Sequence, residues 1–229
     1  EDTAKLQHVE DSSGEHYSRV DVNRSGISLM EIVGEPDLRS AEEARLYLTK
    51  LRTVLQYLGV STGNMEDGSF RCDANISIRQ VGTTDLTDKV EVKNMNSFRS
   101  VYRALIYEGE RQERQLRNGE RIVQETRGWS EAKGVTVSQR SKEYAHDYRF
   151  FAEPDLPPLN IEHKWIEQIR ETLPELPDSR LQRITSQYQI STRDANVLVN
   201  SKAMADFFED CMEIVKRDSD IDIIARAKS

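Results

Sequence analysis

The chain has 229 residues, of which 37% are hydrophobic and 31% charged, and its formal net charge is −8. This composition predicts a soluble globular protein with one large domain or two small ones, and the charge argues against binding nucleic acid through a broad basic surface. No apolar run approaches the roughly 20 residues that span a bilayer, so we expect no membrane association. The two cysteines, Cys72 and Cys211, are far apart, which favours the reducing cytoplasm over a disulfide framework.

The first predicted elements are short extended segments followed by a helix. Residues 19–37 are typical of two extended pieces around Gly26. A helix is then predicted up to Gly59, because Ser40 and Glu43 form a capping box and leucines recur near helical spacing. Gly59 provides the stop signal.

Two alternating segments follow, and we predict that they are antiparallel neighbours in a sheet. Residues 68–79 alternate apolar with polar side chains, and residues 89–95 do the same, which is the period of a strand with one apolar and one polar face. The charged and amide side chains at the polar positions are Arg71, Asp73, Asn75, Lys89, Glu91 and Lys93. The question is whether this polar face only contacts solvent or carries chemistry.

The second half of the chain is predicted to be mostly helical. A long helix is predicted at residues 98–117, with Asn96 or Ser97 as its N-cap, and a hairpin is predicted at residues 120–140. A proline-rich connector follows at residues 146–159. The remaining helical segments are residues 162–172, 178–188, 192–199 and 201–217.

These elements predict an α+β fold, in which an antiparallel sheet domain with flanking helices precedes a small helical domain. We place the first domain at residues 1–158 and the second at residues 159–229. In the second, Trp165, Ile169 and Leu173 recur at helical spacing and are expected to face a core.

Acidic residues on the predicted strands are candidates for a magnesium site, because Mg²⁺ takes a few carboxylates, water and phosphate oxygens. The candidates are Glu1, Glu31, Asp73 and Glu91. Spacing alone does not show that they converge, and a solvated carboxylate is the commoner case. Glu31 differs because its neighbours in ISLMEIV predict burial, which is costly for a carboxylate unless it is paired or bound to a metal.

Other kinds of site are not indicated by the motifs. The histidines lack metal-ligand spacing, and there is no Gly-rich phosphate loop. The aromatic stretch HDYRFF at residues 146–151 has side chains that can stack on a base or a ribose, although a core cluster is the more ordinary role.

Five stretches in order closely resemble the B-subunit family of the aspartyl/glutamyl-tRNA amidotransferase. They are VDVNRSGISLMEIVGEPDLRS, GNMEDGSFRCDANISIR, KVEVKNMNSFRSV, QETRGW and HDYRFFAEPDLPPL. The resemblance implies ATP-dependent phosphorylation of the side-chain carboxylate of Glu-tRNA(Gln) or Asp-tRNA(Asn). Ammonia released from glutamine by a partner amidase would then convert the acyl phosphate to the amide, giving Gln-tRNA(Gln) or Asn-tRNA(Asn).

The same resemblance implies cofactors, partners and site residues. The cofactors are ATP and Mg²⁺. The partners are the amidase, which is the A subunit, together with a small C subunit in a heterotrimer, in the bacterial cytoplasm or, as the alternative, an organelle. The implied ion ligands are Glu31 in LMEIV, Glu91 in KVEVKN and Glu1 in the opening ED, and Glu1 would also line the ammonia route. Asp73 and Asn75 in RCDAN join Glu31 and Glu91 as catalytic candidates. The groups that would contact phosphate, or else serve as surface charges, are Arg71, Lys89 and Lys93.

The resemblance also implies that a Cys-rich zinc-binding portion and a tRNA-contacting tail domain lie outside this chain, so the chain alone is expected to be inactive. Two rival interpretations stay open. One is a non-catalytic tRNA-binding scaffold within the same complex, whose carboxylates only hold structure. The other is an unrelated Mg²⁺-dependent phosphotransferase. The motifs do not distinguish Asp-tRNA from Glu-tRNA as the substrate.

Overall fold

The computed structural model describes residues 5–10, 13–23, 26–141 and 157–217. The chain divides into two compact units, Glu1–Leu38 and Arg39–Ser229. Within the described part, no helix has both the length and the apolar character needed to cross a bilayer.

The first unit contains a two-stranded antiparallel hairpin, β1 (Lys5–Glu10) and β2 (His16–Asp21). After it the chain turns at Gly26, whose φ of 80° lies in the left-handed region that glycine adopts most easily. Residues 28–35 form no regular element, so the second extended piece predicted here is not a strand. The exposed apolar side chains between residues 27 and 35 are Ile27, Leu29, Met30, Ile32 and Val33.

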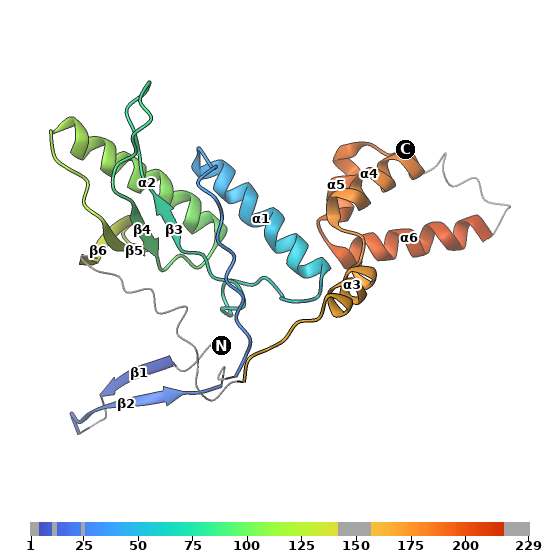
Figure 1. The fold of residues 1–229 in the computed structure, drawn as a ribbon, viewed down its shortest axis with the longest axis horizontal. Coiled ribbons are helices and arrows are strands. Elements are labelled where there is room, and N and C mark those ends of the chain that lie inside the picture. Colours follow the sequence, from blue (N-terminus) through green and yellow to red (C-terminus); the bar gives the residue numbers. More distant parts are fainter. Residues whose placement is uncertain (1–4, 11–12, 24–25, 142–156, 218–229) are drawn as a thin grey trace. The chain divides into compact units, whose positions relative to one another are not determined.

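The second unit is built on a four-stranded sheet (Figure 1). Its strands are β3 (Ala74–Ile76), β4 (Val90–Lys93), β5 (Glu125–Ser130) and β6 (Val135–Ser141), in that spatial order. The pairs β3–β4 and β5–β6 are antiparallel, as predicted, but β4 and β5 are parallel. The reason is α2 (Phe98–Arg117), which carries the chain back along the sheet as a crossover, so that β5 runs in the direction of β4.

Serine caps begin both helices of the sheet region. In α1 (Ala41–Tyr57), the Oγ of Ser40 accepts a hydrogen bond from the backbone N–H of Glu43 at 3.1 Å. In α2, the Oγ of Ser97 accepts one from the N–H of Ser100 at 3.0 Å, which assigns the cap to Ser97. The predicted starts of both helices are therefore confirmed.

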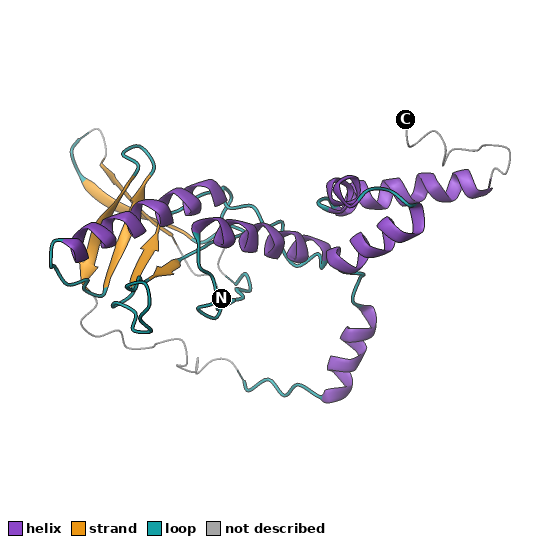
Figure 2. Ribbon diagram, turned by 90° about the horizontal axis from the view of Figure 1, so that it is seen from above, coloured by secondary structure: helices purple, strands orange, loops and turns teal. Residues whose placement is uncertain are grey.

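Helix α2 lies across one face of the sheet (Figure 2). Val90 and Val92 of β4 point to this face and are fully buried. The core beneath the helices consists of Leu48, Val90, Val92, Met95, Val101, Ala104, Ile122 and Trp129. Because side chains alternate along a strand, the polar positions of β3 and β4 lie on the opposite face.

Four further helices end the described chain, in agreement with the predicted segments. They are α3 (His163–Thr172), α4 (Pro177–Tyr188), α5 (Thr192–Val199) and α6 (Lys202–Arg217). Helices α4 to α6 surround a second core, which also contains Tyr57 from the end of α1. The α+β fold class is confirmed, whereas the boundary at residues 158 and 159 stays a prediction because residues 142–156 are not described.

Helix α3 differs from its prediction. Trp165, Ile169 and Leu173 are 48%, 49% and 52% exposed, and no residue of α3 is buried. The helical spacing of the apolar residues was predicted correctly, but in the described part of the chain this stripe is not covered. The prediction that it faces a core is therefore wrong for this structure.

Candidate functional site: the polar face of the sheet

Polar side chains gather on the sheet face opposite α2. Asn75 of β3 is paired with Glu91 of β4, and Glu91 is paired with Thr126 of β5, so the three form one row across the sheet. Lys93 lies two residues beyond Glu91 on the same face, and its Nζ contacts Asp73. We call these five residues, Asp73, Asn75, Glu91, Lys93 and Thr126, the polar face.

A lysine ammonium lies between two carboxylates on the polar face. The Nζ of Lys93 donates a hydrogen bond to Oδ2 of Asp73 at 2.9 Å and is 3.4 Å from Oε1 of Glu91. The other oxygen of Glu91 accepts a hydrogen bond from the hydroxyl of Thr126 at 3.0 Å. The Glu91 side chain is 17% exposed and that of Asp73 is 51% exposed, so solvent and solutes reach this cluster.

Electrostatics keep this ammonium protonated. Partial burial of Lys93 favours the neutral amine, but the hydrogen bond and the negative charges of Asp73 and Glu91 outweigh burial and raise the pKa of Lys93. The arrangement therefore holds two carboxylates and one fixed positive charge close together. A group of this kind can bind a cation through the carboxylates or an anion through the ammonium.

Two side-chain amides extend the polar face toward β6. Gly128 is paired with Lys93, and a Cβ atom on Gly128 would collide with Nε2 of Gln139 and lie 3.0 Å from Nδ2 of Asn94. Asn94 itself has a φ of 64°, in the left-handed region, which redirects the chain directly after β4. Only a residue without a side chain lets these amides lie so close to the sheet.

The other predicted site residues are Glu31, Arg71, Lys89 and Glu1. Glu31 belongs to the first unit and Glu91 to the second, so their convergence stays a prediction. Glu31 is exposed, as are its apolar neighbours, so its predicted burial is wrong for this structure. Arg71 and Lys89 are exposed. Glu1 and the stretch HDYRFF lie outside the described residues.

The polar face carries two carboxylates, and a magnesium site there stays a prediction. Among residues 5–10, 13–23, 26–141 and 157–217, no three or more His, Cys, Asp or Glu side chains form a group that could hold a metal ion. Mg²⁺, however, usually takes only one or two protein carboxylates and completes its shell with water and phosphate oxygens. Asp73 and Glu91 are carboxylates of this kind, so the chemistry of the two side chains suits Mg²⁺, while Lys93 pairs with both of them in this structure.

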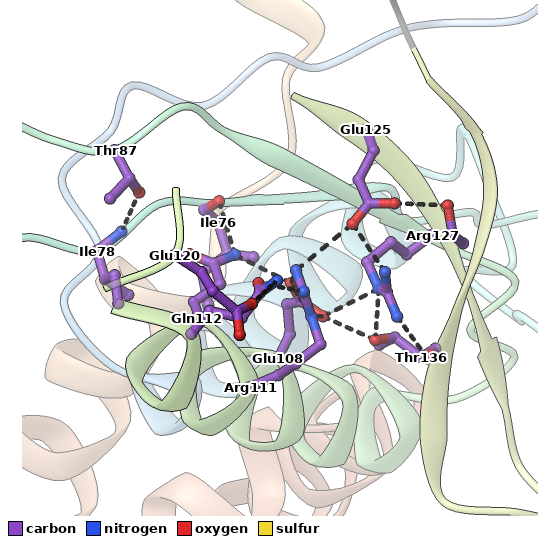
Figure 3. A network of polar contacts seen from close by, with 12 residues as sticks. Ile76, Ile78, Thr87, Glu108, Arg111, Gln112, Glu120, Glu125, Arg127 and Thr136 are labelled. Carbon is purple, nitrogen blue, oxygen red and sulfur yellow. Dashed lines mark hydrogen bonds and ion pairs between the residues drawn. The ribbon is translucent and has the colours of Figure 1, made fainter. Parts of the chain in front are cut away.

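The face covered by α2 contains a buried ionic network that the sequence analysis did not identify (Figure 3). The carboxylate of Glu108 is fully buried and receives hydrogen bonds from Arg111 at 2.5 Å, Gln112 at 3.0 Å and Thr136 at 2.7 Å. The Nε of Arg127 lies 3.5 Å from the same carboxylate. Burial alone would raise the pKa of Glu108, but these hydrogen bonds outweigh it and lower the pKa. The network therefore joins α2 to β5 and β6 through charged side chains.

A signal for this network exists in the sequence. Glu108 lies on the stripe of α2 that also carries Val101 and Ala104, at the helical spacing that predicts burial. The surrounding EGERQERQLR is typical of a solvated helical face, so composition does not distinguish the buried Glu108 from its exposed neighbours. The partner Thr136 is 28 residues away along the chain, so no local pattern reveals it.

Comparisons with known proteins give related sequences for nearly the whole chain. Residues 1–167 match the sequence profile of a family described as "GatB/GatE catalytic domain". The chain is 61% identical over 209 residues to the B subunit of the aspartyl/glutamyl-tRNA(Asn/Gln) amidotransferase from Dehalococcoides mccartyi (strain CBDB1), covering 91% of this chain and 42% of that protein. The protein of the same name from Thermomicrobium roseum is 57% identical over 212 residues, covering 93% of this chain and 44% of that protein. The chain thus spans less than half the length of these curated relatives.

Proposed function

The chain belongs to the GatB/GatE catalytic-domain family, and from that premise we propose that it is part of the activating subunit of a tRNA-dependent amidotransferase. In this proposal the protein uses ATP to phosphorylate the side-chain carboxylate of Glu-tRNA(Gln) or Asp-tRNA(Asn). The names of the bacterial relatives support the substrate class. The chemistry of the polar face supports the reaction type.

The proposed reaction has two steps. A carboxylate oxygen of the tRNA-bound amino acid attacks the γ-phosphorus of ATP, the bond from phosphorus to the β,γ-bridging oxygen breaks, and ADP leaves with that electron pair. Ammonia then attacks the acyl carbon and inorganic phosphate leaves, which yields the amide. In the first step two anions approach each other, so fixed positive charge is needed at the site of attack.

The observation that carries the proposal is the Asp73–Lys93–Glu91 cluster. Asp73 and Glu91 are the residues that would hold Mg²⁺, and a bound Mg²⁺ would neutralise charge on the transferring phosphoryl group. The protonated Lys93 would bind a phosphate oxygen, for which it must exchange its present carboxylate partners. Thr126 orients Glu91 through its hydrogen bond, and Asn75 offers an amide N–H beside it.

The remaining assignments are part of the same proposal. Glu31 and Glu1 would complete the ion ligands, with Glu1 beside the ammonia route, and Arg71 and Lys89 would contact phosphate or solvent. ATP and Mg²⁺ are the proposed cofactors. The amidase, which is the A subunit, would supply ammonia, the small C subunit would complete the heterotrimer, and the cytoplasm would be the compartment. Support for these comes from family membership and from the polar composition of the face.

One observation favours the rival interpretation of a non-catalytic scaffold. Lys93 already pairs with both Asp73 and Glu91, which is what carboxylates with a purely structural role would show. Nucleotide binding separates the two interpretations, because a scaffold has no need to bind ATP. Titration of the full-length complex with ATP and Mg²⁺ should show saturable binding under the proposal.

Site-directed substitution tests the proposed chemistry directly. In the full-length complex, Glu91→Gln and Glu31→Gln keep the shape of the side chain but remove its charge. We expect tRNA-dependent ADP production at limiting Mg²⁺ to fall about a hundredfold, while the amidase partner still releases some ammonia from glutamine. Glu113→Gln on the exposed side of α2 is the matched control. Near-normal ADP production by both variants would show that these carboxylates are structural.

A further inference from the structure

Helix α1 belongs to two hydrophobic cores at once. Leu48, in the middle of α1, packs in the core of the sheet module, which we define as α1, α2 and β3 to β6. Tyr57, the last residue of α1, is only 2% exposed and packs in the core of the helical module, which we define as α4, α5 and α6. One rigid element therefore extends from one module into the other.

Tyr57 is held in the helical module by a polar contact as well as by burial. Its hydroxyl donates a hydrogen bond to the backbone carbonyl of Val199 at 2.9 Å. Val199 is the last residue of α5, and a carbonyl at that place in a helix lacks a partner within the helix. The tyrosine thus supplies a hydrogen bond that the end of α5 needs.

An arginine fixes the other side of the Tyr57 ring. The guanidinium carbon of Arg180 lies 5.8 Å from the ring centroid. The same guanidinium binds Asp206 at 2.7 Å and Glu209 at 2.5 Å, so it connects α4 to α6. Its side chain is 8% exposed, and these two carboxylates compensate the buried charge. Tyr57 therefore sits on a surface that the helical module itself keeps ordered.

The ion pair between Lys50 and Asp178 also joins the modules, but it is weaker. Lys50 of α1 is 2.6 Å from Asp178 of α4, and the two side chains are 62% and 63% exposed. An exposed pair of this kind contributes little to stability. The contact of Tyr57 with Val199, by contrast, is buried, and it joins residues separated by 142 positions. Closing such a large loop costs entropy, which a buried contact can offset and an exposed ion pair cannot.

We infer that Tyr57, together with Arg180, sets the position of the helical module relative to the polar face. We call this contact the Tyr57 joint. Its consequence for activity rests on the proposed function and is part of this inference: if the helical module contacts the tRNA substrate, the joint sets how the aminoacyl end of that tRNA meets the polar face. Tyr57 and Arg180 are positioning residues, since neither lies on the polar face. The joint itself is a property of the structure and can be tested without any activity.

The experiment measures the joint and its consequence in the same full-length complex. Spectroscopic labels are introduced by encoded amino acids at the exposed positions 113 of α2 and 213 of α6, which leaves both native cysteines in place. The wild-type complex should give one narrow distance distribution. Tyr57→Ala should broaden it, and Tyr57→Phe, which keeps the ring and loses only the hydroxyl, should restore most of the narrow peak.

Kinetic measurements then distinguish a positioning role of Tyr57 from a general loss of structure. For Tyr57→Ala we expect the KM for the misacylated tRNA to rise about tenfold, the equivalent of one buried contact, with the KM for ATP unchanged. Tyr47→Ala is the matched control, because Tyr47 is on the same helix but 39% exposed. Tyr188→Phe removes a hydroxyl within the helical module. Both controls should keep the distance distribution and both KM values.

Each outcome decides the inference. An unchanged distance distribution in Tyr57→Ala would overturn the joint, and a broadened distribution with an unchanged KM for tRNA would overturn its positioning role. If Tyr57→Ala does not fold, Tyr57→Leu, which keeps an apolar side chain but loses the ring and hydroxyl, takes its place. A wild-type complex that forms no amide would contradict the proposed function, while the distance measurement would still test the joint.

Discussion

A charged cluster with a glutamate lies on each side of the four-stranded sheet, one around Glu108 of α2 and one around Glu91 of β4, and the two glutamates have different surroundings. Glu108 on the face covered by α2 is fully buried and is bound by three hydrogen-bonding side chains. Glu91 on the polar face is 17% exposed and is bound by Thr126 and Lys93. A buried charge cannot exchange its partners without opening the fold, whereas an exposed one can. Charge on the covered face therefore serves stability, and charge on the polar face is free to serve binding.

The largest expected effect is a loss of folding stability when the ionic network on the covered face is disrupted. Glu108→Gln removes the buried one of the two carboxylates that Arg111 and Arg127 share, the other being Glu125. The loss of one partner from a buried ion pair costs about 3–5 kcal/mol. Glu91→Gln should lower the free energy of unfolding by less than about 1 kcal/mol. Urea unfolding of both variants measures the difference. Equal losses would show that the two faces are not specialised in this way.

The next prediction concerns the competition between Lys93 and a cation for the carboxylates of the polar face. Lys93→Met removes the ammonium from between Asp73 and Glu91, so the two carboxylates should bind Mg²⁺ about tenfold more tightly when no nucleotide is present. Turnover of ATP should fall, because a phosphate contact is lost. Calorimetric titration of the full-length complex with MgCl₂ measures the affinity, and Lys133→Met in the exposed β5–β6 turn is the control. An unchanged affinity would mean that Lys93 does not compete with a cation.

A smaller effect is expected from glycines on the two faces. Gly128→Ala forces the Gln139 amide to move on the polar face, but that amide is the end of a flexible side chain, so the melting temperature should change little. ADP production should fall several-fold, because the amides beside Lys93 are displaced. Gly109→Ala on α2 adds a methyl group 3.8 Å from Ile76, an ordinary contact, and should stabilise the protein by roughly 0.5–1 kcal/mol. A large stability loss in Gly128→Ala would contradict the first expectation.

The smallest predicted effect is a pH dependence of the covered face. The pKa of Glu108 is lowered from its ordinary value of 4.5, so its charged form stabilises the fold at pH above 4.5. This contribution should be lost as the pH falls through the lowered pKa. Urea unfolding at several pH values should show a shallower acid loss in Glu108→Gln than in the wild type. Parallel acid profiles for the two proteins would contradict this assignment.

The sequence predicted the local elements well and the long-range relations less well. The caps at Ser40 and Ser97 and the polar positions of β3 and β4 follow from residues a few positions apart, and the structure confirms them. The parallel pairing of β4 and β5 depends on the path of α2 through space, which no local pattern encodes. The burial of Glu108 depends on Thr136 in a distant strand.

Two predicted burials were wrong for a related reason. The apolar neighbours of Glu31 and the stripe on α3 were expected to be covered, and both are exposed in the described chain. Apolar periodicity predicts which face of an element is apolar, but it does not predict whether the residues that cover this face lie within the same stretch of chain. The candidate site was therefore predictable as a set of residues on two strands. Its relation to Glu31 was not.

The crossover formed by α2 also has a kinetic consequence. The hairpin β5–β6 needs only a tight turn to form. Strand β4, by contrast, cannot pair with β5 until α2, which separates the two strands in the sequence, has folded back along the sheet. Contacts between distant residues form slowly because the loop must first be closed. We therefore expect the row from Asn75 through Glu91 to Thr126 to be completed late in folding. Substitutions in α2 should slow maturation and reduce the yield of folded protein, even where the finished polar face is unchanged.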